Sequence, residues 1–142
     1  MSTKNKGAWK GFERKIAKKF DGERIIRPDW GTPDIDVVAY PFGIECKYRI
    51  NFSFEKALQE AEMYVKTICK YHELIPIAVC QHPGTKNGEF VAIRFGKFLE
   101  VMGLDTTKHK NVAEEIFIVP LKVFLNLLEK NGVKCGTENN SD

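Results

Sequence analysis

The chain has 142 residues, of which 43% are hydrophobic and 29% are charged, a balance typical of one water-soluble domain. Its apolar runs are too short to cross a bilayer, and its first residues lack the apolar core of a secretion signal, so we expect a cytoplasmic protein with no membrane partner. The formal net charge of +3 hides an asymmetry, because residues 1–30 hold nine Lys and Arg against four Asp and Glu. Such a segment can bind phosphate groups, although a solvated helix face has the same composition.

The first half of the chain predicts one helix followed by three strands. Trp9, Phe12 and Ile16 recur at helical spacing and predict a helix over residues 7–20. A short strand is expected over 24–27, followed by a loop rich in Pro and Gly up to residue 33. Alternating sequences then predict strands over 34–39 and 44–48, joined by the four-residue loop 40–43.

The second half continues the alternation of helices and strands. Ser53 is the expected N-cap of a helix that runs to about Tyr71. Strands are predicted over 75–81 and 89–95, followed by a short helix, a strand over 116–119 and a last helix over 121–130. This order predicts a single α/β domain over residues 7–131, with a mixed β-sheet flanked by helices. Residues 1–6 and 133–142 are expected to be flexible tails.

Glu13 occupies an unusual place for an acidic residue. At helical spacing it lies inside the apolar arc formed by Trp9, Phe12 and Ile16 rather than opposite to it. Burial of an ionised carboxylate costs several kcal/mol unless a cation or strong donors face it. We therefore expect a positive group beside Glu13, either as a structural ion pair or as part of a functional site.

The predicted hairpin over 34–48 carries a second group of charged residues. Alternate strand residues share a face, so Asp34 and Asp36 are expected on one face, and Glu45 and Lys47 on the matching face of the next strand. If the four-residue loop aligns the strand ends, Asp36 lies across from Lys47 and diagonal to Glu45. A half-exposed hairpin with a cross-strand salt bridge would have the same pattern.

This arrangement has the residue types that a magnesium-dependent phosphodiesterase needs. Two carboxylates and a backbone carbonyl suffice to hold Mg²⁺ beside a phosphate, because the ion keeps several of its waters. Lys47, two residues after Glu45, would lie beside it and could orient or deprotonate the attacking water and offset charge on the phosphate.

Residues 32–38 (TPDIDVV) followed by residues 43–47 (GIECK) resemble the motif of the PD-(D/E)xK nuclease superfamily. The order of elements is similar over the whole domain, which implies a restriction-endonuclease-like fold. Phe12-Glu13-Arg14 on the first helix and Arg27 after the first strand resemble most the archaeal-type and phage Holliday junction resolvases.

The resemblance implies a role for each matching residue. Glu13, Asp36 and Glu45 would be the acidic catalytic and metal-site positions, and Lys47 the catalytic lysine. The cation would be Mg²⁺, with Mn²⁺ as a substitute, and the backbone carbonyl of Cys46 would be a further ligand. Both Asp34 and Asp36 could fill the aspartate position; we favour Asp36, with Asp34 as a neighbour or second-metal ligand. The expected DNA contacts are Lys4, Lys6, Lys10, Arg14, Lys18 and Arg27.

The expected function is a structure-specific endonuclease that acts on branched DNA, as a homodimer that matches a two-fold symmetric junction. No base-reading module is evident, which favours recognition of DNA shape. One alternative is a restriction or repair endonuclease that cuts linear duplex. Others are a DNA-binding protein without catalysis on the same scaffold and an interaction module whose acids form only ion pairs. Gln59, on the helix after the lysine strand, either reaches the active face or is solvated.

Overall fold

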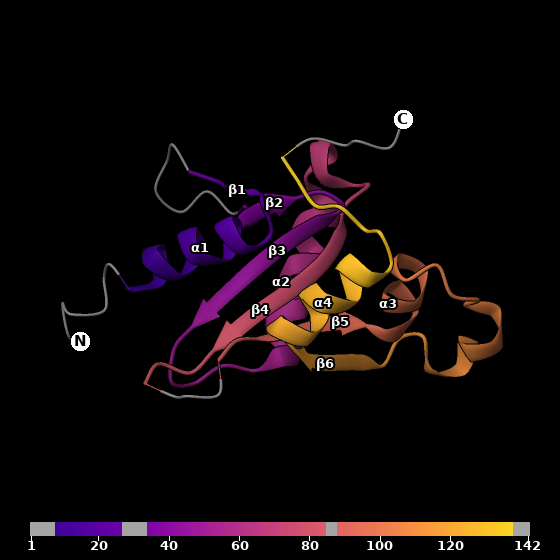
Figure 1. The fold of residues 1–142 in the computed structure, drawn as a ribbon. Coiled ribbons are helices and arrows are strands. Elements are labelled where there is room, and N and C mark those ends of the chain that lie inside the picture. Colours follow the sequence, from indigo (N-terminus) through magenta and orange to yellow (C-terminus); the bar gives the residue numbers. More distant parts are fainter. Residues whose placement is uncertain (1–7, 27–33, 85–87, 138–142) are drawn as a thin grey trace.

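The computed structural model describes residues 8–26, 34–84 and 88–137. It contains the α/β order expected from the sequence, with helices on both faces of one mixed sheet (Figure 1). The elements are α1 (Ala8–Lys19), β1 (Glu23–Arg24), β2 (Val37–Ala39), β3 (Phe42–Tyr48), α2 (Phe54–Thr67), η2 (Cys69–Tyr71), β4 (Ile75–Gln81), β5 (Phe90–Arg94), α3 (Phe95–Val101), η3 (Thr107–Val112), β6 (Ile116–Pro120) and α4 (Leu121–Lys130).

The six strands lie in the sheet in chain order, from β1 to β6. Strands β3 and β4 are parallel, and every other neighbouring pair is antiparallel. A parallel pair needs a crossover connection, and α2 provides it. Helix α2 begins at its expected N-cap, where the Ser53 hydroxyl accepts a hydrogen bond from the Lys56 N–H at 3.3 Å.

Each face of the sheet has its own apolar core. On one face α1 and α4 pack against the strands, and Ile16, Ile44 and Phe124 are fully buried among them. On the other face α2 covers the sheet, with Leu58 and Ala61 fully buried. Since β3 is covered on both sides, it carries buried residues on both faces, and a charged side chain there must find a partner inside the protein.

The first hairpin differs from the prediction in its bounds and register. Strand β3 begins at Phe42, so the connection consists of Tyr40 and Pro41 rather than four residues. Val37 pairs with Ile44, which places Asp36 next to Glu45 rather than across from Lys47. Strand β1 is also shorter than expected and ends at Arg24. The apolar character of Phe42, which is fully buried, draws it into the strand.

The C-terminal segment is packed further than predicted. Val133 and Cys135 lie against the main core, and Gly136 and Tyr40 exchange two backbone hydrogen bonds of 2.7 and 3.1 Å. The expectation of a flexible tail from residue 133 is therefore wrong as far as residue 136, because this segment shields the core beside α4. Within the described ranges no helix combines the length and the apolar character that a membrane crossing requires.

Candidate active site

Three charged side chains are buried in the described part of the chain: Glu13, Asp36 and Glu45, each with 5% or less of its surface exposed. All three influence the thiol of Cys46, whose pKa is raised first by burial and then by these negative charges. The acids that the sequence singled out therefore surround one position on β3. Burial of three carboxylates in a small domain is costly, so their partners determine what the arrangement can do.

A β-bulge places Asp36. Its N–H donates to the carbonyl of Ile44 at 3.1 Å, although Ile44 already pairs with Val37, so two residues of one strand face one residue of the other. The bulge breaks the alternation of side chains. Ile35 consequently packs with Val38, close to Gly43, whereas Val37 lies in the core on the opposite face. Ile35 and Val37 therefore lie on opposite faces of the sheet, although the alternation of a regular strand would place them on the same face.

The carboxylate of Asp36 forms the hydrogen bond that a backbone carbonyl of β2 would form if β2 continued along β3. Its Oδ2 accepts a hydrogen bond from the Cys46 N–H at 2.8 Å, at the point where β2 no longer pairs with β3. The N–H and C=O groups of one strand residue point toward the same neighbour. The Cys46 carbonyl is thus directed to the side on which Asp36 lies, as a ligand role for both would require.

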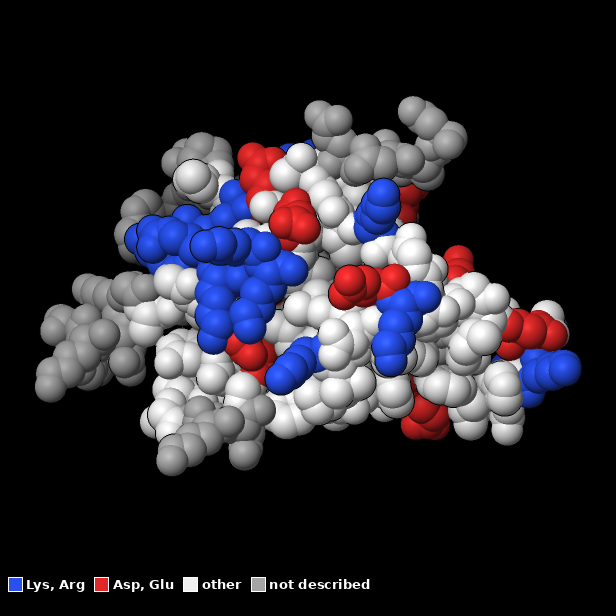
Figure 2. Space-filling model, in the orientation of Figure 1, with Lys and Arg blue, Asp and Glu red and all other residues white. Residues whose placement is uncertain are grey.

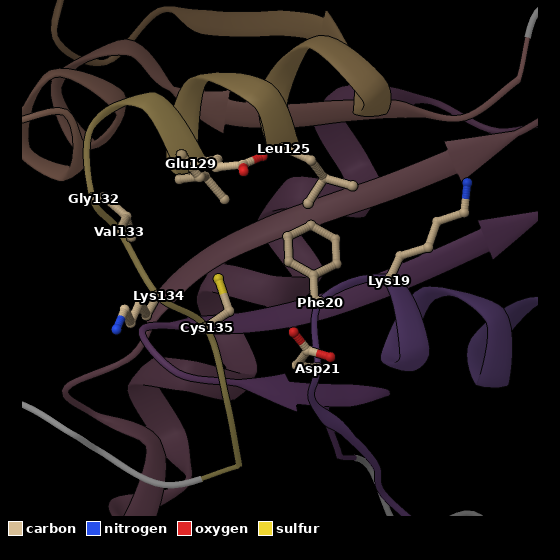
Figure 3. Close-up of a pocket in the computed structure, with 10 residues that line it drawn as sticks. Lys19, Phe20, Asp21, Leu125, Glu129, Gly132, Val133, Lys134 and Cys135 are labelled. Carbon is tan, nitrogen blue, oxygen red and sulfur yellow. The ribbon is translucent and has the colours of Figure 1, made fainter.

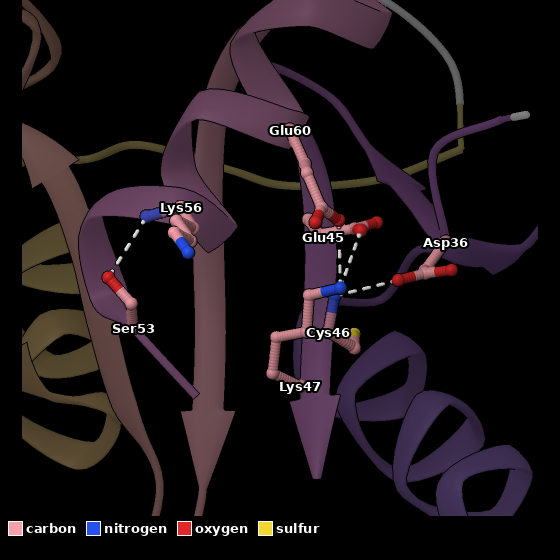
Figure 4. A network of polar contacts seen from close by, with 7 residues as sticks. All are labelled: Asp36, Glu45, Cys46, Lys47, Ser53, Lys56 and Glu60. Carbon is pink, nitrogen blue, oxygen red and sulfur yellow. Dashed lines mark hydrogen bonds and ion pairs between the residues drawn. The ribbon is translucent and has the colours of Figure 1, made fainter. Parts of the chain in front are cut away.

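Glu45, Lys47 and Glu60 form a compact group on the α2 face of β3 (Figure 4). The Nζ of Lys47 lies 3.3 Å from Glu45 Oε2 and 2.8 Å from Glu60 Oε2. Asp36 approaches the same region from the segment before β2. The lysine amine is therefore beside the Glu45 carboxyl, as expected from their spacing, and it is also held by a helix residue.

Electrostatics within this group favour a protonated Glu45 carboxyl beside an ionised Glu60 carboxylate. Burial, together with the neighbouring carboxyl groups of Glu60 and Asp36, raises the pKa of Glu45 to about 10, and the opposing effect of the Lys47 charge is smaller. The pKa of Glu60 is lowered, chiefly by its hydrogen bond with Glu45 and also by Lys47. Burial lowers the pKa of Lys47, but Glu60 and Glu45 outweigh it, so the amine stays protonated at neutral pH.

The donor set around Glu45 fits a hard divalent cation. Glu45 Oε1 is buried and accepts no hydrogen bond from the described residues, so one carboxylate oxygen is left for a further ligand. Asp36 raises the Glu45 pKa by like-charge repulsion, which a cation between the two carboxylates would relieve. Among the described residues, no three Asp, Glu, His or Cys side chains lie close enough to form a complete metal cage. Mg²⁺ does not need one, because water supplies its other ligands.

Glu13 approaches β3 from the opposite face. It is carried by α1, and its Oε1 accepts a hydrogen bond of 2.7 Å from the Arg24 guanidinium on β1. The expected positive partner of this buried acid is thus Arg24. The structure places Glu13 near Cys46 but does not bring it into the group formed by Glu45, Lys47 and Glu60.

Asp34 lies in a different environment from Asp36. Its Oδ1 accepts a hydrogen bond from the Ile35 N–H at 2.7 Å. Its charge also acts on Tyr71, whose pKa rises to about 12 because of burial and of Asp34. Both aspartates precede β2, which begins at Val37, so the strand alternation that predicted a shared face does not apply to them. A second-metal role for Asp34 stays a prediction.

Glu60 is the site residue that the sequence analysis missed. Its neighbour Gln59, which was expected either to reach the active face or to be solvated, is exposed to solvent. Glu60 borders the apolar arc of α2, between the buried residues Ala57 and Ala61. An acid on this border, in the helix that follows the lysine strand, is the signal that could have identified it, since an inward-pointing lysine needs an anionic partner.

A stripe of basic side chains covers the exposed side of α1 (Figure 2). Lys10, Arg14 and Lys18 are exposed and form no ion pair with a described acidic residue. Lys15 and Lys19, in contrast, pair with Glu89 at 2.6 and 3.5 Å. The other proposed DNA contacts, Lys4, Lys6 and Arg27, lie outside the described residues.

Described residues line at least two surface cavities. One, of about 460 Å³, lies between the ends of α1 and α4, where Phe20 and Leu125 face each other and the Cys135 thiol points toward them (Figure 3). None of the three buried acids lines it. The other, of about 350 Å³, adjoins Lys47 and Glu60 at the beginning of α2.

Comparisons with protein-family models, with curated proteins and with solved structures found no match to this chain.

Proposed function

We propose that this protein is a divalent-cation-dependent DNA endonuclease of the PD-(D/E)xK type. The observation that carries the proposal is the meeting of two buried carboxyls, Asp36 and Glu45, with the Lys47 amine 3.3 Å from the second of them. A stable fold gains little from a buried acid whose neighbours are mostly acids. A bound divalent cation would neutralise these carboxyls, and the Lys47 amine beside them would contact a phosphate group.

The residues divide the chemistry among them. Asp36 and Glu45, with the Cys46 carbonyl, would hold Mg²⁺, or Mn²⁺ in its place, and Glu45 would give up its proton in doing so. The bound cation supplies a Lewis acid for phosphodiester hydrolysis by water. Lys47 remains protonated, so it serves as a donor that orients the phosphate and offsets the charge developing on it, rather than as a base.

The proposed substrate is branched DNA such as a Holliday junction, bound by a homodimer. The basic stripe Lys10, Arg14 and Lys18 supports contact with phosphates, which gives affinity without base specificity. Arg14 and Lys10 flank Glu13 on α1, so DNA bound along this helix would reach the sheet near β1 and β3.

The test compares a four-way junction with a linear duplex of the same sequence, with and without Mg²⁺. The proposal expects paired, symmetric nicks in the junction that require the cation and that disappear in Asp36→Asn and in Lys47→Ala. Cleavage of both substrates would support the proposed metal-dependent hydrolysis but would overturn the preference for branched DNA in favour of activity on linear duplex. Binding of DNA by the parent protein without cleavage in Mg²⁺ or Mn²⁺ would overturn the enzymatic proposal in favour of a binding protein.

A further inference from the structure

A cavity of about 350 Å³ opens beside Lys47, between the end of β3 and the beginning of α2. Phe52 and Ala57 are the apolar residues of its lining, and the polar ones are Lys47, Arg49, Asn51, Ser53, Lys56 and Glu60. Three cations thus face one carboxylate. The single carboxylate, Glu60, is already engaged by the Lys47 amine at 2.8 Å, so the cavity has a net positive charge.

Two of these cations have no anionic partner among the residues that the structure describes. Arg49 and Lys56 are exposed, and neither side chain forms an ion pair or hydrogen bond with a described residue. Both side chains nevertheless line the cavity, together with Lys47. An anion that entered the cavity would meet both side chains and the Lys47 amine.

The wall that carries Arg49 is fixed by side-chain contacts. The rings of Phe52 and His82 stack with centroids 4.3 Å apart, and Nδ1 of His82 lies 2.9 Å from the Ile50 carbonyl oxygen. Helix α2 begins at Ser53, which also lines the cavity, so the partial positive charge of a 14-residue helix adds to that of the side chains. The cavity is therefore cationic. The chain segment that carries Arg49 is held in place by the contacts of Phe52 and Ile50 with His82.

We propose that this cavity is a phosphate-binding subsite, which holds the backbone phosphate next to the one that is cleaved. Phosphate binding follows from the cavity and its charges. The placement next to the reacting phosphodiester rests on the proposed function, because Lys47 lines the cavity and also contacts Glu45. Arg49 and Lys56 would fix the register of the strand, and Lys47 would lie between the two phosphates.

The first experiment titrates inorganic phosphate into the full chain and follows backbone amide resonances. Saturable shifts are expected over residues 53–57 in the parent protein and should be lost in Arg49→Ala/Lys56→Ala. The matched control is Lys66→Ala/Lys70→Ala, which removes the same charge from the other end of the same helical region and should bind phosphate normally. Because all four side chains are exposed, thermal denaturation should show that both variants fold. Equal shifts in the two double variants, or no saturable shift in the parent, would overturn the subsite.

The second experiment locates the phosphate within DNA and needs no cleavage. Single methylphosphonates are placed at successive positions of a four-way junction, and binding is measured without divalent cation. At one position the neutral linkage should weaken parent binding by roughly three- to tenfold and leave Arg49→Ala/Lys56→Ala unaffected. The nick mapped in the separate cleavage assay should lie next to this position. Phosphate shifts without such a position would overturn the placement on the DNA strand. If the parent protein binds DNA with a 5′-phosphorylated end more tightly than DNA with a 5′-hydroxyl end, and the same variant loses this preference, the cavity binds a terminal phosphate. That result would overturn its assignment to an internal phosphate.

Discussion

The Nζ of Lys47 lies closer to Glu60, at 2.8 Å, than to Glu45, at 3.3 Å. The lysine on β3 is therefore positioned by the crossover helix α2 as well as by its own strand. This relationship also explains why the amine keeps its charge in a partly buried setting, since Glu60 and Glu45 together outweigh the effect of burial on its pKa.

Replacement of Glu60 by glutamine should slow cleavage without weakening DNA binding. The amide keeps the size of the side chain but removes the charge that holds Lys47, and loss of positioning at a reacting centre costs roughly 10- to 100-fold in rate. The Lys47 pKa should fall as well, because the amine loses an anionic neighbour. The loss of activity that accompanies deprotonation of Lys47 at alkaline pH should therefore begin at a lower pH than in the parent. Cleavage rates measured from pH 6 to 10 give both effects.

The control for this variant is Glu55→Gln, which removes an exposed acid from the first turn of the same helix. It should leave the rate and its pH profile unchanged. A positioning role for Glu60 would be excluded by a Glu60→Gln protein that cleaves at the parental rate and with the parental profile.

Glutamine at position 45 should stabilise the protein at pH 8 in the absence of divalent cations. Burial, with the Glu60 and Asp36 carboxyls, raises the folded-state pKa of Glu45 to about 10 from its ordinary value of 4.5. Between these values the folded state keeps a proton that the unfolded state releases, so stability falls as the pH rises through this window. Glu45→Gln removes that loss and should melt above the parent at pH 8, with little difference at pH 4.

Magnesium ions should reverse the order of the two proteins. A cation that replaces the proton of Glu45 stabilises only the parent, so Mg²⁺ should raise the parental melting temperature at pH 8 and leave that of Glu45→Gln almost unchanged. Thermal denaturation over a series of Mg²⁺ concentrations provides the measurement. A lower melting temperature for the variant in cation-free buffer would show that the buried carboxyl stabilises the fold.

The fold could be predicted from the sequence because its elements follow local patterns. The apolar spacing of Phe12, Ile16 and Phe20 determines α1, and Ser53 marks the beginning of α2. The hairpin was harder, because its register depends on where Phe42 is buried and on a bulge at Asp36, which are tertiary features. The observed register differs from the expected one by two residues, so Asp36 lies next to Glu45 instead of Lys47. Because side chains alternate with a period of two, both registers fit the same sequence pattern.

The candidate site could be predicted only where one strand or one helix face determined it. Glu45 and Lys47 lie two residues apart on a strand, so their proximity follows from the strand period, and the burial of Glu13 follows from its helical position. Glu60 could not be found in this way, because its contact with Lys47 depends on how α2 crosses the sheet. The interaction of Asp34 with Tyr71 could not be predicted for the same reason, since the two residues are distant in sequence.

Loss of the Arg24 side chain should destabilise the fold more than an exposed substitution does. Arg24→Ala leaves the carboxylate of Glu13, which is 5% exposed, without its guanidinium partner. Removal of one member of a buried pair costs about 3 kcal/mol, against less than about 0.5 kcal/mol for a typical surface change. Urea denaturation of Arg24→Ala and of its exposed neighbour variant Glu23→Gln measures the difference. Equal stabilities would show that Glu13 does not depend on Arg24.

The basic stripe on α1 should determine how DNA binding depends on salt. Lys10, Arg14 and Lys18 lack acidic partners among the described residues, whereas Lys15 and Lys19 are paired with Glu89. Each phosphate contact that is lost reduces the slope of log affinity against log salt by about 1. Lys10→Ala/Arg14→Ala/Lys18→Ala should therefore reduce the slope by about 3, and Lys15→Ala/Lys19→Ala by less than about 1 per residue. Equilibrium binding to a four-way junction at several salt concentrations measures both slopes, and equal reductions per residue would indicate that the stripe is an ordinary solvated helix face.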